Sequence, residues 1–162
     1  MTAALDPTSS AGPLPEGADQ ARLIVCERFG RWAVALRREL PVPGVRLYET
    51  RSTAECWAML ARSGASFVVV ELTRSGARYL LERMAWLERD FPLARVAVVA
   101  ERALASYEWL IREAGAVHFT VSPRKLRPLA CLAVRHLDSV PRPRLSLTKR
   151  IWGDLPWRPP EG

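Results

Sequence analysis

Residues 66–72 (SFVVVEL) constrain the fold of this chain more than any other stretch, because they place four apolar residues in succession, three of them valine. Such a run suits a strand that is covered on both faces, as in the interior of a parallel sheet. In open α/β sheets, ligands and reactive groups lie just beyond the carboxyl ends of such strands. Glu71, near the carboxyl end of this run, is therefore the first candidate functional residue.

Short apolar runs and helical patterns alternate on either side of this strand. Ser52 is expected to cap the second helix, and Gly115 to end the fourth. Five strands that alternate with five helices predict an α/β domain, in which right-handed crossovers give a parallel sheet with helices on both faces. The strands are expected at residues 22–26, 45–49, 66–72, 95–100 and 117–121, and the helices at 29–40, 53–62, 77–90, 104–114 and 125–137.

Two terminal segments fall outside this alternation. Residues 1–20 contain proline and glycine without apolar periodicity and are expected to be a flexible leader. Residues 140–162 form a tail that prolines interrupt, and most of the net charge of +7 lies toward this end, with 9 Lys+Arg against 3 Asp+Glu over residues 122–162. This tail is disordered, is a short docking motif, or uses its basic residues to contact nucleic acid or an anionic membrane. Its candidate partner-binding residues are Ile151, Trp152, Leu155 and Trp157.

The composition favours a single globular domain. A chain of 162 residues that is 49% hydrophobic and 25% charged is large enough to bury one core. No apolar run reaches the roughly 18 residues that a membrane span needs, and the N-terminus lacks a signal-peptide pattern. Cys26, Cys56 and Cys131 are widely separated and odd in number, which predicts reduced, buried thiols in a cytoplasmic protein.

Three short motifs add a family resemblance. Glu71-Leu72 ends the central strand, Glu113-Ala114-Gly115-Ala116 precedes the fifth strand, and Ser122-Pro123 follows it. In order and spacing, residues 21–139 resemble the receiver domain of bacterial two-component response regulators. The resemblance implies a flavodoxin-like, doubly wound five-stranded parallel sheet in the order 2-1-3-4-5, with helices on both faces.

A working receiver resembles a small magnesium-dependent phosphotransferase, and the resemblance assigns its five functional positions to residues of this chain. The metal-binding acid pair corresponds to Cys26 and Glu27, the nucleophilic aspartate to Glu71, and the phosphoryl-binding hydroxyl and lysine to Ala100 and Ser122. A thiol is a poor magnesium ligand, and without the lysine and hydroxyl nothing neutralises charge on a transferred phosphoryl group. These residues therefore predict a degenerate phosphoacceptor pocket without catalytic residues, metal or cofactor.

Each acidic residue of this pocket has two interpretations. Glu71 either mimics a phosphorylated aspartate or pairs locally, and local pairing is preferred. Glu27 either retains half of a metal site or is a solvated loop residue, and the solvated residue is preferred. His118 is expected to be a satisfied strand residue and His136 a surface residue. No P-loop, G-x-G-x-x-G motif or Ser-His-Asp arrangement supports another enzyme class.

The predicted function is a non-catalytic pseudo-receiver that acts as a protein-interaction module in phosphorelay signalling or regulation. One alternative is an unconventional phosphoacceptor or enzyme around Glu27 and Glu71. The other is a nucleic-acid-binding regulator that uses the basic C-terminal tail.

The resemblance also suggests where a protein partner binds, because receivers commonly use the face formed by the fourth helix, fifth strand and fifth helix. Tyr107 and Trp109 are the candidates on this face if they are exposed. Packing in the core is nevertheless the preferred expectation for Trp57, Trp86 and Trp109. The sequence leaves open whether the chain forms a homodimer.

Overall fold

The computed structural model describes residues 20–41 and 45–141. The predicted leader over residues 1–20 lies outside this range except for residue 20, and the predicted tail over residues 140–162 lies outside it except for its first two residues. The tail candidates Ile151, Trp152, Leu155 and Trp157 are thus not among the described residues. Within the described ranges, none of the helices combines the length and hydrophobicity that crossing a bilayer requires.

Five parallel strands form one sheet in the order β2-β1-β3-β4-β5, which confirms the predicted order. The inner strands β1, β3 and β4 are buried along almost their whole length, because helices cover the sheet on both sides. Glu71 and Arg95 are the exceptions within them. The strands are β1 (Leu23–Cys26), β2 (Leu47–Thr50), β3 (Phe67–Leu72), β4 (Arg95–Ala100) and β5 (His118–Thr120).

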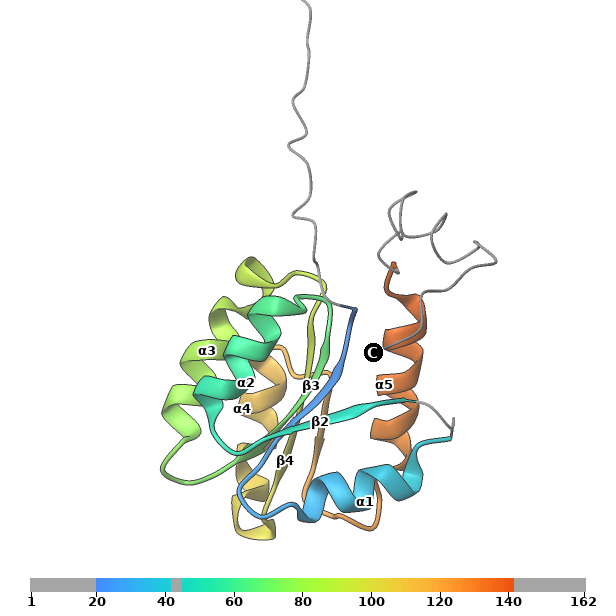
Figure 1. The fold of residues 1–162 in the computed structure, drawn as a ribbon. Coiled ribbons are helices and arrows are strands. Elements are labelled where there is room, and N and C mark those ends of the chain that lie inside the picture. Colours follow the sequence, from blue (N-terminus) through green and yellow to red (C-terminus); the bar gives the residue numbers. More distant parts are fainter. Residues whose placement is uncertain (1–19, 42–44, 142–162) are drawn as a thin grey trace, which may run out of the picture.

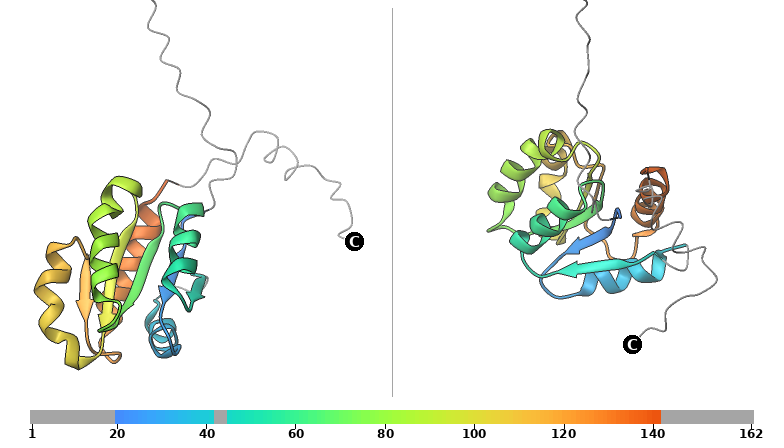
Figure 2. Two further views of the ribbon diagram at one scale, coloured as in Figure 1. Left: turned by 90° about the vertical axis from the view of Figure 1, so that its left-hand side faces the viewer. Right: turned by 45° about the horizontal axis from the view of Figure 1, so that its top comes forward.

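The helices form a layer on each face of the sheet (Figures 1 and 2). Successive residues of a strand point to opposite faces, so Val68 and Val70 pack into one core while Phe67 and Val69 pack into the other. The first core lies under α2 (Thr53–Arg62), α3 (Ala77–Asp90) and α4 (Glu108–Glu113), and the second under α1 (Arg31–Glu39) and α5 (Arg127–Ser139).

The structure differs from the predicted helix over residues 104–114 in the type of helix. It begins as a 3-10 helix, η1 (Arg102–Tyr107), and becomes α-helical only at α4. A 3-10 helix repeats every three residues. Leu104 and Tyr107 therefore both turn toward the core, where Leu104 is buried and Tyr107 is half-buried. Gly115 follows α4 with a φ of 97°, a conformation that glycine adopts without strain.

Several predictions about burial are wrong. Trp57 is buried as expected, but Trp86 and Trp109 are 54% and 71% exposed because they lie on the outer faces of α3 and α4. Cys131, expected to be buried, is exposed on α5. His136, expected at the surface, is half-buried, and its Nε2 lies 2.9 Å from the carbonyl oxygen of Ala65.

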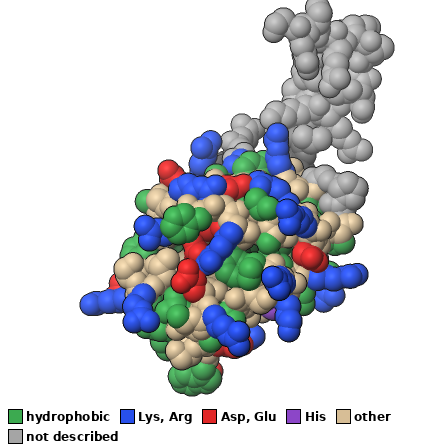
Figure 3. All heavy atoms as spheres, turned by 90° about the horizontal axis from the view of Figure 1, so that it is seen from below, with side chains coloured by type: hydrophobic (Ala, Val, Ile, Leu, Met, Phe, Trp, Pro, Cys, Tyr) green, Lys and Arg blue, Asp and Glu red, His purple; other side chains and the backbone are tan. Residues whose placement is uncertain are grey.

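All five strands run in the same direction, so their carboxyl ends meet at one edge of the sheet. This edge lies at the bottom of Figure 1, beside the start of α1. Figure 3 views the molecule from that side and shows Lys and Arg side chains spread over the face, with fewer Asp and Glu side chains between them. The residues of the predicted pocket belong to this edge.

Candidate functional site

Glu71 projects from the carboxyl end of β3 and accepts hydrogen bonds from three donors. Its side chain is 7% exposed. Oε1 accepts from Nη2 of Arg31 at 3.0 Å and from Nε1 of Trp32 at 3.2 Å, and Oε2 accepts from the backbone N–H of Arg28 at 3.0 Å. All three donors belong to the β1–α1 connection and the first turn of α1. Glu71 therefore joins β3 to the start of α1.

Glu27 is buried, and its carboxylate caps α1. Oε2 accepts from the backbone N–H of Trp32 at 2.9 Å, and Oε1 accepts from that of Ala33 at 2.6 Å. These N–H groups belong to the first turn of the helix, where no backbone carbonyl is available to them. The expectation of a solvated loop residue is wrong: Glu27 is 2% exposed because it satisfies this helix end from inside the domain.

The local sequence explains why this cap comes from Glu27. The residue before α1 is Gly30, which has no side chain to accept a hydrogen bond and a φ of 82°. This left-handed conformation favours glycine, and it turns the chain back sharply between β1 and α1. The turn brings the first N–H groups of α1 to Glu27, and the negative carboxylate also suits the positive end of the helix dipole.

Arg31 supplies the positive charge at this site. Its Nη2 lies 3.0 Å from Oε1 of Glu71 and 3.4 Å from Oε1 of Glu101, which follows β4. The guanidinium also lies over the ring of Trp32, with 5.1 Å between Cζ and the ring centroid. The Arg31 side chain is 41% exposed, whereas the Glu71 carboxylate that it pairs with is 7% exposed, so loss of Arg31 would leave that carboxylate without its charge partner. An internal cation thus neutralises Glu71.

Cys26, the residue at the first metal-acid position, is buried beside Cys56 of α2. A hydrogen bond with the Cys56 side chain lowers the pKa of Cys26 to about 7, against the opposing effect of burial. The same hydrogen bond, together with burial, raises the pKa of Cys56. Sulfur nevertheless remains a poor ligand for a hard cation.

The two remaining pocket positions do not act on Glu71. Ala100 ends β4 with its side chain fully buried, opposite Leu72 in the register of the sheet. Ser122 is half-buried after β5, and its backbone N–H donates to Oγ1 of Thr120 at 3.3 Å. Within the described part of the chain, no hydrogen bond joins Ser122 to Glu71, so the structure does not unite the five positions into one working site.

The receiver resemblance implies a magnesium ion, and the residues present do not fit it. All four carboxylate oxygens of Glu27 and Glu71 already accept hydrogen bonds from N–H groups or a guanidinium. The third candidate, Cys26, offers sulfur in place of oxygen. In the described residues, no group of three or more His, Cys, Asp or Glu side chains is arranged to hold a metal ion.

Sequence reasoning missed Arg31 and Trp32, the two side chains that complete the Glu71 site. Both are about 40 residues from Glu71 in sequence, and nothing local marks them as its partners. The available signal was the fold itself, because β1 and β3 are neighbours in the predicted strand order. This order places the helix after β1 beside the carboxyl end of β3, where a glutamate without metal or lysine needs a cation.

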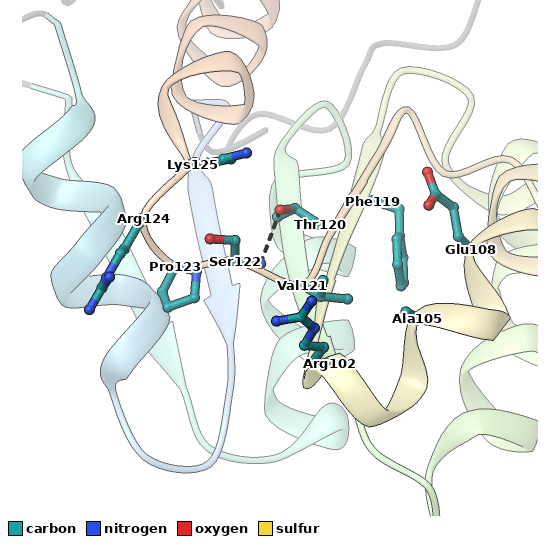
Figure 4. Close-up of a pocket in the computed structure, with 10 residues that line it drawn as sticks. All are labelled: Arg102, Ala105, Glu108, Phe119, Thr120, Val121, Ser122, Pro123, Arg124 and Lys125. Carbon is teal, nitrogen blue, oxygen red and sulfur yellow. Dashed lines mark hydrogen bonds between the residues drawn. The ribbon is translucent and has the colours of Figure 1, made fainter.

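Of the partner-binding candidates in the described residues, Trp109 fits best. It is 71% exposed on α4, next in sequence to exposed Leu110, whereas Tyr107 packs partly against the core. A groove lies close by at the carboxyl end of β5, between η1 and the segment that joins β5 to α5 (Figure 4).

Comparison with known proteins identifies the fold. No protein-family model and no curated protein matches the sequence. The structure is similar to a crystal structure of a response regulator from Thermotoga maritima, with a TM-score of 0.56 and 20% sequence identity. The similarity covers 74% of this chain and 99% of that chain. The chain therefore has the flavodoxin-like fold of a response-regulator receiver domain, as its motifs predicted.

Proposed function

We propose that this protein is a pseudo-receiver, a signalling module that binds protein partners without being phosphorylated through the usual aspartate and magnesium chemistry. The main support for the proposal is that the Glu71 carboxylate already accepts hydrogen bonds from Arg31, Trp32 and the backbone N–H of Arg28. A phosphoacceptor needs a carboxylate oxygen free to attack and a cation free to neutralise the phosphoryl group. Here both groups are already paired with each other.

The same contacts support local pairing as the role of Glu71. A phosphoryl mimic would need to present its charge to groups that distinguish two states of the domain. Glu71 is 7% exposed and holds α1 against β3, so its charge is used inside the fold. The pocket formed by Cys26, Glu27, Glu71, Ala100 and Ser122 is on this proposal a structural remnant without catalytic residues, metal or cofactor.

The proposed partner surface is the face made by α4, β5 and α5. Trp109 is its most exposed aromatic residue, and aromatic side chains commonly contribute strongly to protein interfaces. The tail residues Ile151, Trp152, Leu155 and Trp157 remain sequence-based candidates for a second contact. Such a module would act in the cytoplasm with its thiols reduced. An enzyme around Glu27 and Glu71, nucleic-acid binding by the tail, and a homodimer stay predictions from the sequence.

Treatment with a small-molecule phosphodonor and magnesium tests the proposal. Intact mass is measured for the wild-type chain and for Glu71→Gln, with a functional receiver domain as the positive control. We expect no stable gain of a phosphoryl group on the wild type under conditions that modify the control. A phosphoryl gain on the wild type that is absent from Glu71→Gln would overturn the proposal.

A further inference from the structure

The groove at the carboxyl end of β5 is open, whereas the Glu71 site is filled. It has a volume of about 620 Å³, and its walls come from η1 on one side and from the β5–α5 connection on the other. Figure 4 shows Arg102 on the first wall and Lys125 on the second, with the hydroxyl groups of Thr120 and Ser122 between them. The groove can therefore admit an extended ligand from outside the domain.

Positive charge in this groove has no internal partner. Arg102, Arg124 and Lys125 are exposed, and within the described residues none of their side chains makes a hydrogen bond or ion pair. The groove's one acidic residue, Glu108, is already paired with Arg112, with 2.9 Å between Oε1 and Nη2. By contrast, Arg31 at the neighbouring site contacts two carboxylates. A ligand of negative charge would complement the groove.

The floor of the groove is apolar, so a ligand that fills the groove should also present an apolar group to it. Phe119 is buried there, and Val121 and Ala105 lie beside it. Single-stranded nucleic acid is usually bound on exposed aromatic rings that stack with its bases, and Phe119, the groove's one aromatic residue, is 6% exposed. The combination of free cations with a small apolar floor suits an acidic peptide segment better than a nucleic acid.

We infer that this groove binds an acidic segment of a partner protein, with carboxylates at Arg102 and Lys125 and one apolar side chain over Val121 and Ala105. The inference rests on the proposed function, since it names the chemistry of the partner that the interaction module binds. The side chains of Arg124 and Lys125 point in different directions in Figure 4, so Arg124 is assigned to the rim. Charge complementarity of this kind chiefly sets the specificity and rate of association.

Selection from a library of random 12-residue peptides tests the inference without presuming a sequence. The full-length wild type is compared with Arg102→Glu/Lys125→Glu and with the charge-matched control Arg46→Glu/Arg62→Glu, whose sites are exposed and lie away from the groove. We expect peptides from the wild type and the control to be enriched at least twofold in Asp and Glu around a Leu or Phe. We expect no such enrichment on the groove variant.

A selected peptide then gives the affinity, with circular dichroism establishing that each variant is folded. The groove variant should bind at least tenfold more weakly than the wild type, and the control within twofold. Selection without acidic enrichment, or equal binding by the groove variant, would overturn the inference. So would tighter binding of a 12-nucleotide single strand that the groove substitutions abolish.

These outcomes separate the inference from the function on which it rests. The phosphodonor experiment reports on Glu71 and does not involve Arg102 or Lys125. If peptide binding fails while the chain stays unphosphorylated, the acidic partner is wrong and the pseudo-receiver proposal stands. If the chain is phosphorylated at Glu71, the pseudo-receiver proposal fails whichever peptides the groove selects.

Discussion

Two sites lie at the carboxyl edge of the sheet, and they differ in whether their charged side chains are paired within the chain. At the ends of β1 and β3, the carboxylates of Glu27 and Glu71 are buried and every oxygen has a partner from α1 or the connection before it. Beyond β5, the side chains of Arg102 and Lys125 are exposed and make no hydrogen bond or ion pair in the described structure. The first site is completed by the chain itself, and the second needs an external ligand to be completed.

The contrast shows that, among the described residues, one edge of the sheet holds carboxylates paired within the chain and, beyond β5, cationic side chains without such pairs. Buried charges are tolerated only when they are paired and hydrogen-bonded, so removal of one partner from the Glu71 site should destabilise the domain. Unpaired charges in solvent cost little to keep, and they remain available to a partner. Substitutions at the first site should therefore change stability, and substitutions at the second should change binding.

The largest expected effect is that of Glu27→Ala. This change leaves two buried N–H groups of α1 without acceptors and removes two charge-assisted hydrogen bonds. We expect a loss of about 3 kcal/mol in the free energy of unfolding, measured by urea denaturation. Glu88→Ala, on the exposed side of α3, serves as the control and should change stability by less than about 0.5 kcal/mol. A loss below about 1 kcal/mol for Glu27→Ala would contradict the capping role.

Arg31→Met comes next, with an expected loss of about 2 kcal/mol, because it leaves the buried carboxylate of Glu71 without its cation. The value is below that for a fully buried pair, since Arg31 is 41% exposed in its side chain. A double-mutant cycle with Glu71→Met measures the pairing directly. If the two single losses simply add, the two residues are not coupled and the ion pair does not stabilise the fold.

A smaller, pH-dependent effect is expected from the histidines on the β5 and α5 side. Burial and the nearby Arg112 lower the pKa of His118, and burial lowers the pKa of His136. The unfolded chain therefore takes up protons first as the pH falls below the ordinary value of 6.5, which favours unfolding. Stability should decrease from pH 6.5 downward, and less steeply in His118→Phe. Parallel curves for His118→Phe and the wild type in urea denaturation would contradict this assignment.

The smallest effect on stability is expected from Lys125→Ala in the groove. Because Lys125 is exposed and makes no ion pair in the described structure, its removal should change the free energy of unfolding by less than about 0.5 kcal/mol. Affinity for an acidic peptide should nevertheless fall, which is the reverse of the result expected for Arg31→Met. A Lys125→Ala chain that unfolds as readily as Arg31→Met would remove the distinction between the two sites.

The sequence predicted the fold more accurately than it predicted the surroundings of individual side chains. The strand at residues 66–72 was recognisable because three consecutive valines suit only a few environments, and the motifs at residues 71–72, 113–116 and 122–123 indicated the strand order. Burial of Trp86 and Trp109 was predicted wrongly, because a large apolar side chain on a helix occurs in the core and at interfaces alike. Whether such a side chain is buried depends on which side of its helix packs against the sheet.

The sequence by itself determined that this is a parallel α/β domain, and its resemblance to receivers predicts that the residues of a working phosphoacceptor are missing from it. Strand and helix formation depend on short-range patterns of apolar residues, which any chain displays openly. Only the tertiary structure decided what Glu71 does instead, since its partners Arg31 and Trp32 on α1 approach it through the pairing of β1 with β3. A carboxylate's role depends on the donors around it in space, and neither its identity nor its sequence neighbours specify those donors.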